Sequence, residues 1–304
     1  MTNKTYENLK YSIENGEVTI TGYIDKPKGK LIIPEIIEGY PVTVIGNHAF
    51  AYCFSLSSVK MPNVQTIDGY AFFGCSSITS VEMPNAQSIG DSAFAVCSSL
   101  ASVEMQNVQT IGGYAFQDCN SIKSVEMPNV QTIYDSAFSD CRSIMLVEMR
   151  NVQTIYKWAF SRCSSLTSVI MPNVQTISYF AFCQCSSLTS AYFYSDAPTS
   201  FGMEVFYECA PGFTIYYAKG TSGWTTPAWN GYATREFEPT DYHYVPFIDG
   251  STGERIAKYA VKDGSNALPP EPPAHDDYTF TVWDSDGKDI TADTKITALY
   301  EKML

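Results

Sequence analysis

A block of 22 residues recurs without slippage from about residue 45 to residue 198, and this repeat restricts the chain to very few folds. The copy from Leu100 to Ser121 reads LASVEMQNVQTIGGYAFQDCNS. A unit of this length cannot bury its apolar face alone and must stack on copies of itself, so the sequence predicts a solenoid. Three columns step by 22 in seven copies: Ile45, Ile67, Ile89, Ile111, Ile133, Ile155 and Ile177; Phe50, Phe72, Phe94, Phe116, Phe138, Phe160 and Phe182; Cys53, Cys75, Cys97, Cys119, Cys141, Cys163 and Cys185.

The two halves of each copy have different apolar periods. In the first half, Val103 and Met105 flank the charged Glu104, which is the alternation of a half-buried strand. In the second half, apolar residues fall at i, i+1, i+4 and i+7 from Ala115, which predicts one face of a short helix or 3₁₀ segment. Stacking then gives a parallel sheet on one side of the solenoid and short helical segments on the other.

An asparagine column lies between the two halves and is expected to turn the chain. Asparagine tolerates left-handed backbone angles and bonds its own backbone, which suits a turn. The column consists of Asn63, Asn85, Asn107, Asn129, Asn151 and Asn173.

Two segments carry a resemblance to a known family: the run IPEIIEGYPVTVIGNHAFAYC from Ile33 to Cys53, and the recurring MPNVQTIxxxAFxxCSSL. They resemble the leucine-rich repeats of the BspA type (Treponema pallidum type) found in bacterial surface proteins, over about residues 6–238. This chain departs by a unit one residue shorter and by Val, Ile and Met in place of most leucines. The resemblance implies a leucine-rich repeat solenoid on a secreted or surface-displayed, non-enzymatic, adhesin-like protein.

The last part of the chain has a different composition and no repeat. It resembles the Listeria–Bacteroides repeat, a β-grasp-like module of internalin-type surface proteins, which implies a spacer role; where that family usually has Gly before the tryptophan, this chain has Val282. The matching residues are Asp263-Gly264, Pro269 to Pro273, Tyr278-Thr279-Phe280 with Trp283, and Thr291 to Tyr300. We therefore predict an N-terminal cap at 1–44, repeats at 45–210, a C-terminal cap at 211–240 and the β-grasp-like module at 241–304.

Charge and apolar content limit the partners. The net charge of −13 argues against nucleic acid, because binding to phosphates relies on Lys and Arg, and it favours a partner with a basic segment. No stretch of about 18 apolar residues occurs, so we expect no membrane span. The N-terminus shows no signal peptide, and the family resemblance implies that a leader has been removed.

The residues that usually carry chemistry do not form a recognisable site. The nine cysteines fall largely in one inward column, which favours a structural stack over disulfides or a metal site. The three histidines belong to no zinc or Ser-His-Asp pattern, and the acidic run from Asp284 to Asp289 lacks the glycine position of an EF-hand. We expect no enzyme activity and no cofactor.

Two outward columns are the candidate binding surfaces. The first follows the buried valine of each strand, and its alternative interpretation is a solvated, solubilising face. The second precedes the Ala-Phe pair, and its alternative is packing against the next copy's helix; exposed aromatic residues there would be typical of interfaces. The candidate ligand-binding residues are Glu82, Glu104, Glu126, Glu148 and Tyr192 in the first column and Tyr70, Tyr114 and Trp158 in the second.

These columns lead to two functional hypotheses. The first is a protein ligand from a host or a neighbouring bacterium, which would dock on the repeats. The alternative is a carbohydrate-binding surface protein of a polysaccharide-uptake system, with the aromatic column stacking on sugars.

Overall fold

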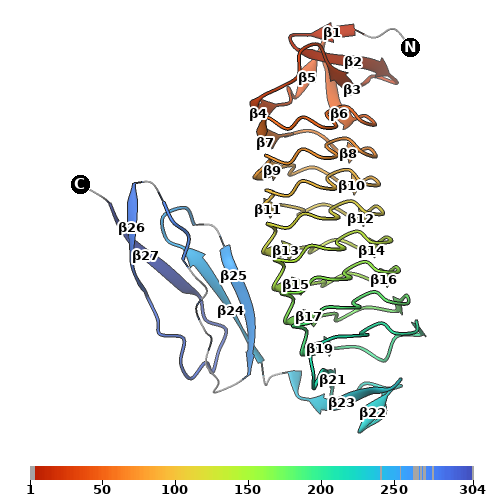
Figure 1. Cartoon of the computed structure of the whole chain (residues 1–304), viewed down its shortest axis with the longest axis vertical. Coiled ribbons are helices and arrows are strands. Elements are labelled where there is room, and N and C mark those ends of the chain that lie inside the picture. Colours follow the sequence, from red (N-terminus) through yellow and green to blue (C-terminus); the bar gives the residue numbers. More distant parts are fainter. Residues whose placement is uncertain are drawn as a thin grey trace. The chain divides into compact units, whose positions relative to one another are not determined.

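The computed structural model describes residues 4–239, 242–253, 255–262, 267, 269, 272–275 and 277–302. The chain divides into two compact units, Met1–Arg235 and Glu236–Leu304. In the first unit the 22-residue copies stack one on the next, and each copy forms one rung of a solenoid (Figure 1). We name each rung by the phenylalanine of its Ala-Phe pair.

Two ladders of parallel strands run along the solenoid, and both keep the 22-residue register. Val147 pairs with Val169 in the first, ladder A, and Ile133 pairs with Ile155 in the second, ladder B. Ladder A contains β7 (Leu56–Lys60), β9 (Ser80–Glu82), β11 (Ser102–Val103), β13 (Ser124–Glu126), β15 (Leu146–Glu148), β17 (Ser168–Ile170), β19 (Ser190–Phe193) and β21 (Thr214–Ala218). Ladder B contains β6 (Tyr40–Ile45), β8 (Thr66–Ile67), β10 (Ser88–Ile89), β12 (Thr110–Ile111), β14 (Thr132–Ile133), β16 (Thr154–Ile155), β18 (Thr176–Ile177) and β20 (Ser200–Phe201).

The columns of identical residues form one continuous core between the ladders, as the repeat predicts. The phenylalanine rings stack from rung to rung; those of Phe138 and Phe160 lie 5.1 Å apart with an interplanar angle of 4°. The methionine, isoleucine and cysteine columns are buried beside them. Stacked rings with centroids at this distance add attraction beyond the burial of their area.

The predicted helical segments are wrong: between residues 4 and 235 the structure contains strands and turns and no helix. The apolar spacing instead belongs to two consecutive tight turns, closed by Ala115 N–H to Gly112 O and Cys119 N–H to Phe116 O. The backbone has positive φ at Tyr114 and Asp118, both 58°. That angle at the third residue of a four-residue turn is typical of type II turns.

Hydrogen bonds between rungs explain why these turns replace a helix. The N–H groups of Tyr114, Phe116 and Asp118 donate to carbonyl oxygens of the next rung at 2.8, 2.8 and 3.0 Å. A helix would use the same N–H groups within its own rung. The turns therefore extend the ladder pattern around the solenoid and hold neighbouring rungs in register.

The asparagine column also binds the neighbouring rung, so the expectation that it bonds its own backbone is wrong. Asn107 Nδ2 donates to Pro84 O at 2.7 Å, and Asn129 Nδ2 donates to Gln106 O at 2.6 Å. Each asparagine thereby donates to the backbone carbonyl at the proline position of the preceding rung, at the corner after ladder A.

Both ends of the solenoid are covered by strands that depart from the repeat. At the N-terminal end, β3 pairs antiparallel with β2 and parallel with β6. At the C-terminal end, a hairpin of β22 and β23 carries Trp229 and Tyr232 over Phe201, Phe206 and Phe213. The cap strands are β1 (Lys4–Tyr6), β2 (Leu9–Glu14), β3 (Glu17–Tyr23), β4 (Gly29–Ile32), β5 (Ile36–Ile37), β22 (Ala228–Trp229) and β23 (Tyr232–Phe237).

The second unit contains a four-stranded mixed sheet of its own. Its order is β25-β24-β27-β26, with β24 and β27 parallel and the outer pairs antiparallel. Val245, Phe247 and Ile296 form its separate core with Trp283. The strands are β24 (Tyr242–Asp249), β25 (Arg255–Lys262), β26 (Tyr278–Trp283) and β27 (Ile296–Lys302).

Part of the resemblance to the Listeria–Bacteroides repeat falls outside the described residues. Asp241 at the predicted boundary, Asp263-Gly264, Pro270 and Glu271 all lie there. The family assignment of the second unit therefore stays a prediction. Among the described residues, no helix has the length and apolar character needed to cross a membrane.

Candidate functional site

The glutamate column lies along ladder A, where successive rungs bring its members side by side. Glu104 pairs in register with Glu126, and Glu126 pairs in register with Glu148. Glu82 differs, because Lys60 on the preceding rung forms an ion pair with it at 3.0 Å. Only the backbone of Glu148 is described. The predicted acidic row is therefore continuous in its backbone, with its first member compensated by a lysine.

Tyr192 continues the same column beyond Ile170, away from the other aromatic candidates. Its backbone pairs with Ile170 on one side and Tyr216 on the other. The rings of Tyr192 and Tyr216 stack with centroids 5.0 Å apart, and Tyr192 is 9% exposed. The structure thus places Tyr192 with the glutamates on ladder A and apart from Tyr70, Tyr114 and Trp158.

Tyr70, Tyr114 and Trp158 occupy the positive-φ position of the first turn in their rungs, with φ from 56° to 58°. This turn geometry leaves the side chains on the surface, exposed by 39%, 43% and 37% respectively. The predicted alternative names packing against the next copy's helix, whereas residues 4–235 contain no helix. The rings pack on the same column of a neighbouring rung where that residue is aromatic: Tyr70 on His48 of the preceding rung at 4.7 Å, and Trp158 on Phe180 of the following rung at 6.1 Å.

Three exposed tyrosines that the sequence analysis overlooked lie beside this column. Tyr134 and Tyr156 stack with centroids 5.1 Å apart, and Tyr179 meets the Trp158 ring edge-on at 5.8 Å. They are 43%, 38% and 42% exposed. They occur one or two residues before the inspected column, so a search of one position per rung missed them. We call Tyr114, Tyr134, Tyr156, Trp158 and Tyr179 the aromatic cluster.

The side chain of Lys157 lies beside Trp158, within the aromatic cluster. Its ammonium lies 3.2 Å from an oxygen of Asp135 and 5.5 Å from the centroid of Trp158. The pKa of Lys157 is raised, first by the hydrogen bond and charge of Asp135 and then by Tyr179 and Tyr114 nearby. A cation over an indole face adds a modest attraction.

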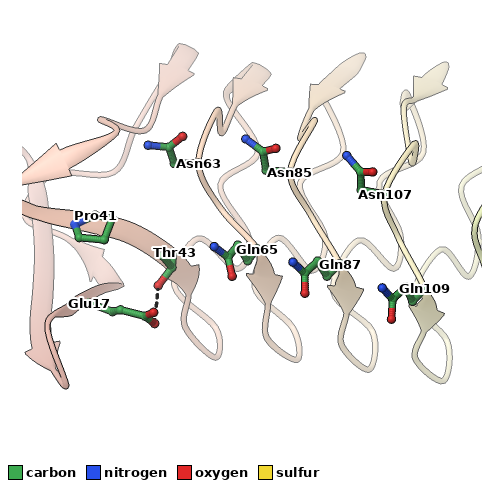
Figure 2. Close-up of a pocket in the computed structure, with 9 residues that line it drawn as sticks. All are labelled: Glu17, Pro41, Thr43, Asn63, Gln65, Asn85, Gln87, Asn107 and Gln109. Carbon is green, nitrogen blue, oxygen red and sulfur yellow. Dashed lines mark hydrogen bonds between the residues drawn. The ribbon is translucent and has the colours of Figure 1, made fainter.

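A second feature that sequence reasoning missed is a groove lined by side-chain amides. Each rung contributes one asparagine and one glutamine, which flank a buried valine or alanine at the corner between the ladders. Figure 2 shows the asparagines in one row and the glutamines in another, next to the hydrogen bond from Thr43 to Glu17. The residues of the two rows in this part are Asn63, Asn85, Asn107, Gln65, Gln87 and Gln109, and the groove is repeated further along by Asn129, Asn151, Asn173, Gln131, Gln153 and Gln175.

The second unit contains a Ser-His-Asp cluster whose geometry does not match a catalytic triad. His275 Nε2 lies 2.7 Å from Asp249 Oδ2 and 3.0 Å from Ser251 Oγ. In a triad the carboxylate and the hydroxyl contact different ring nitrogens, so that the imidazole takes the proton of the hydroxyl while the carboxylate orients the ring. Here both contact the same nitrogen, and Ser251 Oγ donates to Asp249 Oδ1 at 2.7 Å. The cluster is a structural network at the end of β24.

Among the described residues, no group of three or more His, Cys, Asp or Glu side chains is placed to hold a metal ion. The thiols of Cys97 and Cys119 donate hydrogen bonds to backbone carbonyl oxygens inside the core.

The chain is similar to solved structures of leucine-rich repeat proteins. A solved leucine-rich repeat protein from T. pallidum is 26% identical, with 66% of this chain and 86% of that chain covered and a TM-score of 0.49. A leucine-rich cell surface protein from Faecalibacterium prausnitzii A2-165 is 23% identical, with 71% and 76% covered and a TM-score of 0.47. A leucine-rich repeat protein from Bacteroides ovatus ATCC 8483 is 20% identical, with 78% and 77% covered and a TM-score of 0.46.

No curated protein matches the chain significantly. The family model of the BspA type leucine rich repeat region matches residues 32–145 and 87–212. Together the two matches span residues 32–212, which is more than half of the chain. This protein therefore belongs to the BspA-type leucine-rich repeat family.

Proposed function

We propose that this protein is a secreted or surface-displayed bacterial scaffold that binds another protein, in the manner of an adhesin, and that it has no enzymatic role. The observation that carries the proposal is the aromatic cluster around Lys157. Repeat scaffolds offer extended surfaces for partners rather than enclosed reaction sites, and the family membership of the chain agrees with that use.

The aromatic cluster has the composition of a protein-binding surface. Neighbouring exposed aromatic residues are unusual on a surface that meets only water, and Tyr and Trp are enriched among residues that dominate binding energy. Tyr134 and Tyr156 stack on each other, so their rings are already ordered before a partner arrives. Binding to ordered side chains loses less conformational entropy.

Ladder A supplies a second, electrostatic contribution. Glu104 is exposed, and it lies in register with Glu126 on a chain with a net charge of −13. Complementary charge speeds encounter and orients a partner more than it adds affinity. We therefore expect the partner to carry a basic segment that approaches the acidic side of the solenoid.

The proposal is tested with labelled full-length protein on intact bacterial and epithelial cells. We expect saturable binding that disappears when the cells are treated with protease, because the ligand is a protein. The double variant Tyr134→Ser/Tyr156→Ser should bind at least about tenfold more weakly, as expected when hot-spot aromatic residues are removed.

A matched control uses exposed tyrosines outside the cluster. Tyr40→Ser/Tyr52→Ser removes two phenols that are 43% and 52% exposed, and it should leave binding unchanged. Binding that survives protease treatment, or that is the same for the wild type and the cluster variant, would refute the proposal.

A further inference from the structure

A groove with two chemically different walls runs over the turns of the Phe138, Phe160 and Phe182 rungs. It has a volume of about 380 Å³. The residue after each core phenylalanine decides its depth: this position holds Ser139, Ser161 and Cys183 here. The same position holds larger side chains in the flanking rungs, Gln117 and Tyr207, which close the two ends. We call it the serine groove.

One wall of the serine groove is aromatic. Trp158 and Phe180 lie on successive rungs with ring centroids 6.1 Å apart and nearly parallel planes, 16° apart. Trp158 is 37% exposed, so part of its ring is open to a ligand. The electron-rich face of an indole attracts groups with positive edges, which include polarised C–H bonds.

The opposite wall is polar, and its side chains are already held in place. Arg162 Nη1 lies 3.6 Å from Asp140 Oδ2, and Arg162 Nε donates to Gln184 Oε1 at 3.0 Å. Gln184 Nε2 in turn donates to Glu208 Oε2 at 2.8 Å, and Arg142 Nη2 donates to Asp140 Oδ1 at 3.0 Å. Burial raises the pKa of Asp118, and the charges of Asp140, Arg142 and Arg162 act on it as well, so three carboxyl groups lie near two guanidinium groups here.

The floor carries hydroxyl groups that the protein itself does not use. Ser136, Ser139 and Ser161 are 5%, 4% and 8% exposed, and all three line the groove. Within residues 4–239, none of these hydroxyls forms a hydrogen bond, and none is sealed away from the groove. Water in the groove reaches these hydroxyls, and a ligand that bonds them takes the place of that water.

We propose that the serine groove binds a short neutral oligosaccharide. A pyranose ring has an apolar face of C–H bonds and a rim of hydroxyls, which matches an aromatic wall, a polar wall and a floor of hydroxyls. Trp158 stacks on the face of the sugar, while Arg162 and Gln184 bond its hydroxyls as donors and Asp140 accepts from them. With three carboxyl groups near two guanidinium groups, the polar wall favours a neutral sugar over an acidic one.

A peptide side chain fits the same surfaces less well. An aromatic or proline side chain could cover Trp158 but would leave the polar wall and the serine hydroxyls without partners. The polar wall extends from Asp140 to Gln184, two rung steps of about 4.8 Å each, or about 10 Å. That length accommodates a di- or trisaccharide.

The oligosaccharide site is independent of the proposed protein ligand, although Trp158 contributes to both surfaces. In the oligosaccharide site the polar contacts come from Asp140, Ser139, Ser161, Arg162 and Gln184. The protein-binding test above changes only Tyr134 and Tyr156. Failure of one proposal therefore leaves the other measurable.

The test applies full-length protein to an array of neutral glycans and measures the affinities of hits, together with cellotriose, maltotriose and chitotriose, by calorimetry. We expect at least one neutral oligosaccharide to bind. Trp158→Ala should weaken that binding at least about tenfold, and Arg162→Met should do so to a similar extent by removing donors while keeping the bulk of the side chain.

Tyr52→Ala is the control, because Tyr52 is an exposed aromatic residue with φ of 59°, against 56° for Trp158, and it does not line the serine groove. It should leave sugar binding unchanged. Circular dichroism of each variant shows whether the solenoid is intact, and Arg162→Met, at an exposed side chain, decides the outcome if Trp158→Ala is misfolded. The proposal is overturned if no neutral glycan binds, if only acidic glycans bind, or if sugar binding survives in folded Trp158→Ala or Arg162→Met.

Discussion

The thiol of Cys119 donates a hydrogen bond to the carbonyl oxygen of Phe94, one rung earlier, across 3.2 Å. The same carbonyl accepts the N–H of Cys97 within its own rung, also at 3.2 Å. The cysteine therefore bonds the turn of the preceding rung, which an alanine at the same position could not do. The contact recurs along the column: Cys75 to Phe50, Cys97 to Phe72, Cys141 to Phe116, Cys163 to Phe138, Cys185 to Phe160 and Cys209 to Phe182.

This position predicts that the thiols are reduced and unreactive in the folded protein. Burial raises the pKa of Cys97 to about 12 and raises that of Cys119 as well, so neither is a thiolate near neutral pH. Titration with a chromogenic disulfide at pH 8 should label the column slowly in native buffer and all nine thiols rapidly in denaturant. Rapid labelling of several thiols in native buffer would contradict the prediction.

Val96 should be a strained residue whose replacement by glycine stabilises the solenoid. It has φ of 62°, a left-handed angle that is costly for a β-branched side chain, and its exposed side chain contributes little packing. Val96→Gly should raise the free energy of unfolding by about 1 kcal/mol. The reciprocal change, Gly74→Val at φ of 68°, should lower it, and chemical denaturation of both variants measures the difference. A less stable Val96→Gly variant would show that the angle is not strained.

The core of this fold was predictable from the sequence, because identical columns at a fixed interval leave few ways to stack. The turns were not, since Ala115, Phe116 and Cys119 have spacings that suit both a helix face and two tight turns. The decisive signal was the residue two places after each core phenylalanine. Gly74, Asp118 and Asp140 there favour positive φ, but Val96 and Arg162 obscure the pattern.

The candidate sites were predictable only in part, for a similar reason. Reading one column at a time found Tyr114 and Trp158 but missed Tyr156 in the adjacent column. The serine groove depends on small residues in one column, Ser139 and Ser161, facing large ones in another. Such complementarity becomes visible when the rungs are compared in three dimensions, because residues of successive rungs line the same groove.

The glutamate column predicts a difference between two otherwise equivalent substitutions. Glu104 lies in register with Glu126, whereas Glu82 forms an ion pair with Lys60. Like charges at the rung spacing of about 4.8 Å repel by about 1 kcal/mol in water. Glu104→Gln should therefore raise the melting temperature, and Glu82→Gln should leave it unchanged or lower it.

Salt dependence separates this charge effect from other consequences of the same substitutions. The gain from Glu104→Gln should be largest at low ionic strength and should diminish as salt screens the repulsion. The quadruple change of Glu82, Glu104, Glu126 and Glu148 to Gln should show the same trend. A Glu104→Gln variant that melts below the wild type at low salt would mean that this carboxylate has stabilising contacts.

The two units should unfold independently because their cores are separate. The solenoid core includes Phe206 and Ile215, whereas Phe247 and Ile296 belong to the other core. A chain ending at residue 238 retains all of β23 and should show the same melting temperature as the solenoid transition of the full chain. Calorimetry of both proteins measures this. If the shortened chain fails to fold, the solenoid requires the second unit.

Asp249 should make the second unit sensitive to acid. Its carboxylate is almost fully buried at the end of β24 and accepts hydrogen bonds from Ser251 N–H at 2.8 Å and Ser251 Oγ at 2.7 Å. Burial alone would raise the pKa of Asp249, but these bonds, with those from His275 and Thr252, outweigh it and hold the pKa below its usual value. A lowered pKa in the folded state means that the ionised form is favoured by folding.

The stabilisation from Asp249 is therefore complete above the unfolded pKa of about 3.9 and is lost as the pH falls through the folded value. Asp249→Asn should lower the stability of the second unit by about 1–3 kcal/mol at pH 7, because it removes an acceptor from buried donors. Thermal unfolding followed by Trp283 fluorescence, with the other tryptophans replaced by phenylalanine, should show the gap between wild type and variant shrinking from pH 5 to pH 2. A gap that stays constant across that range would mean that Asp249 is not the acid-sensitive group, and Asp284, which accepts from Thr297 N–H at 2.7 Å, would be the next carboxylate to replace.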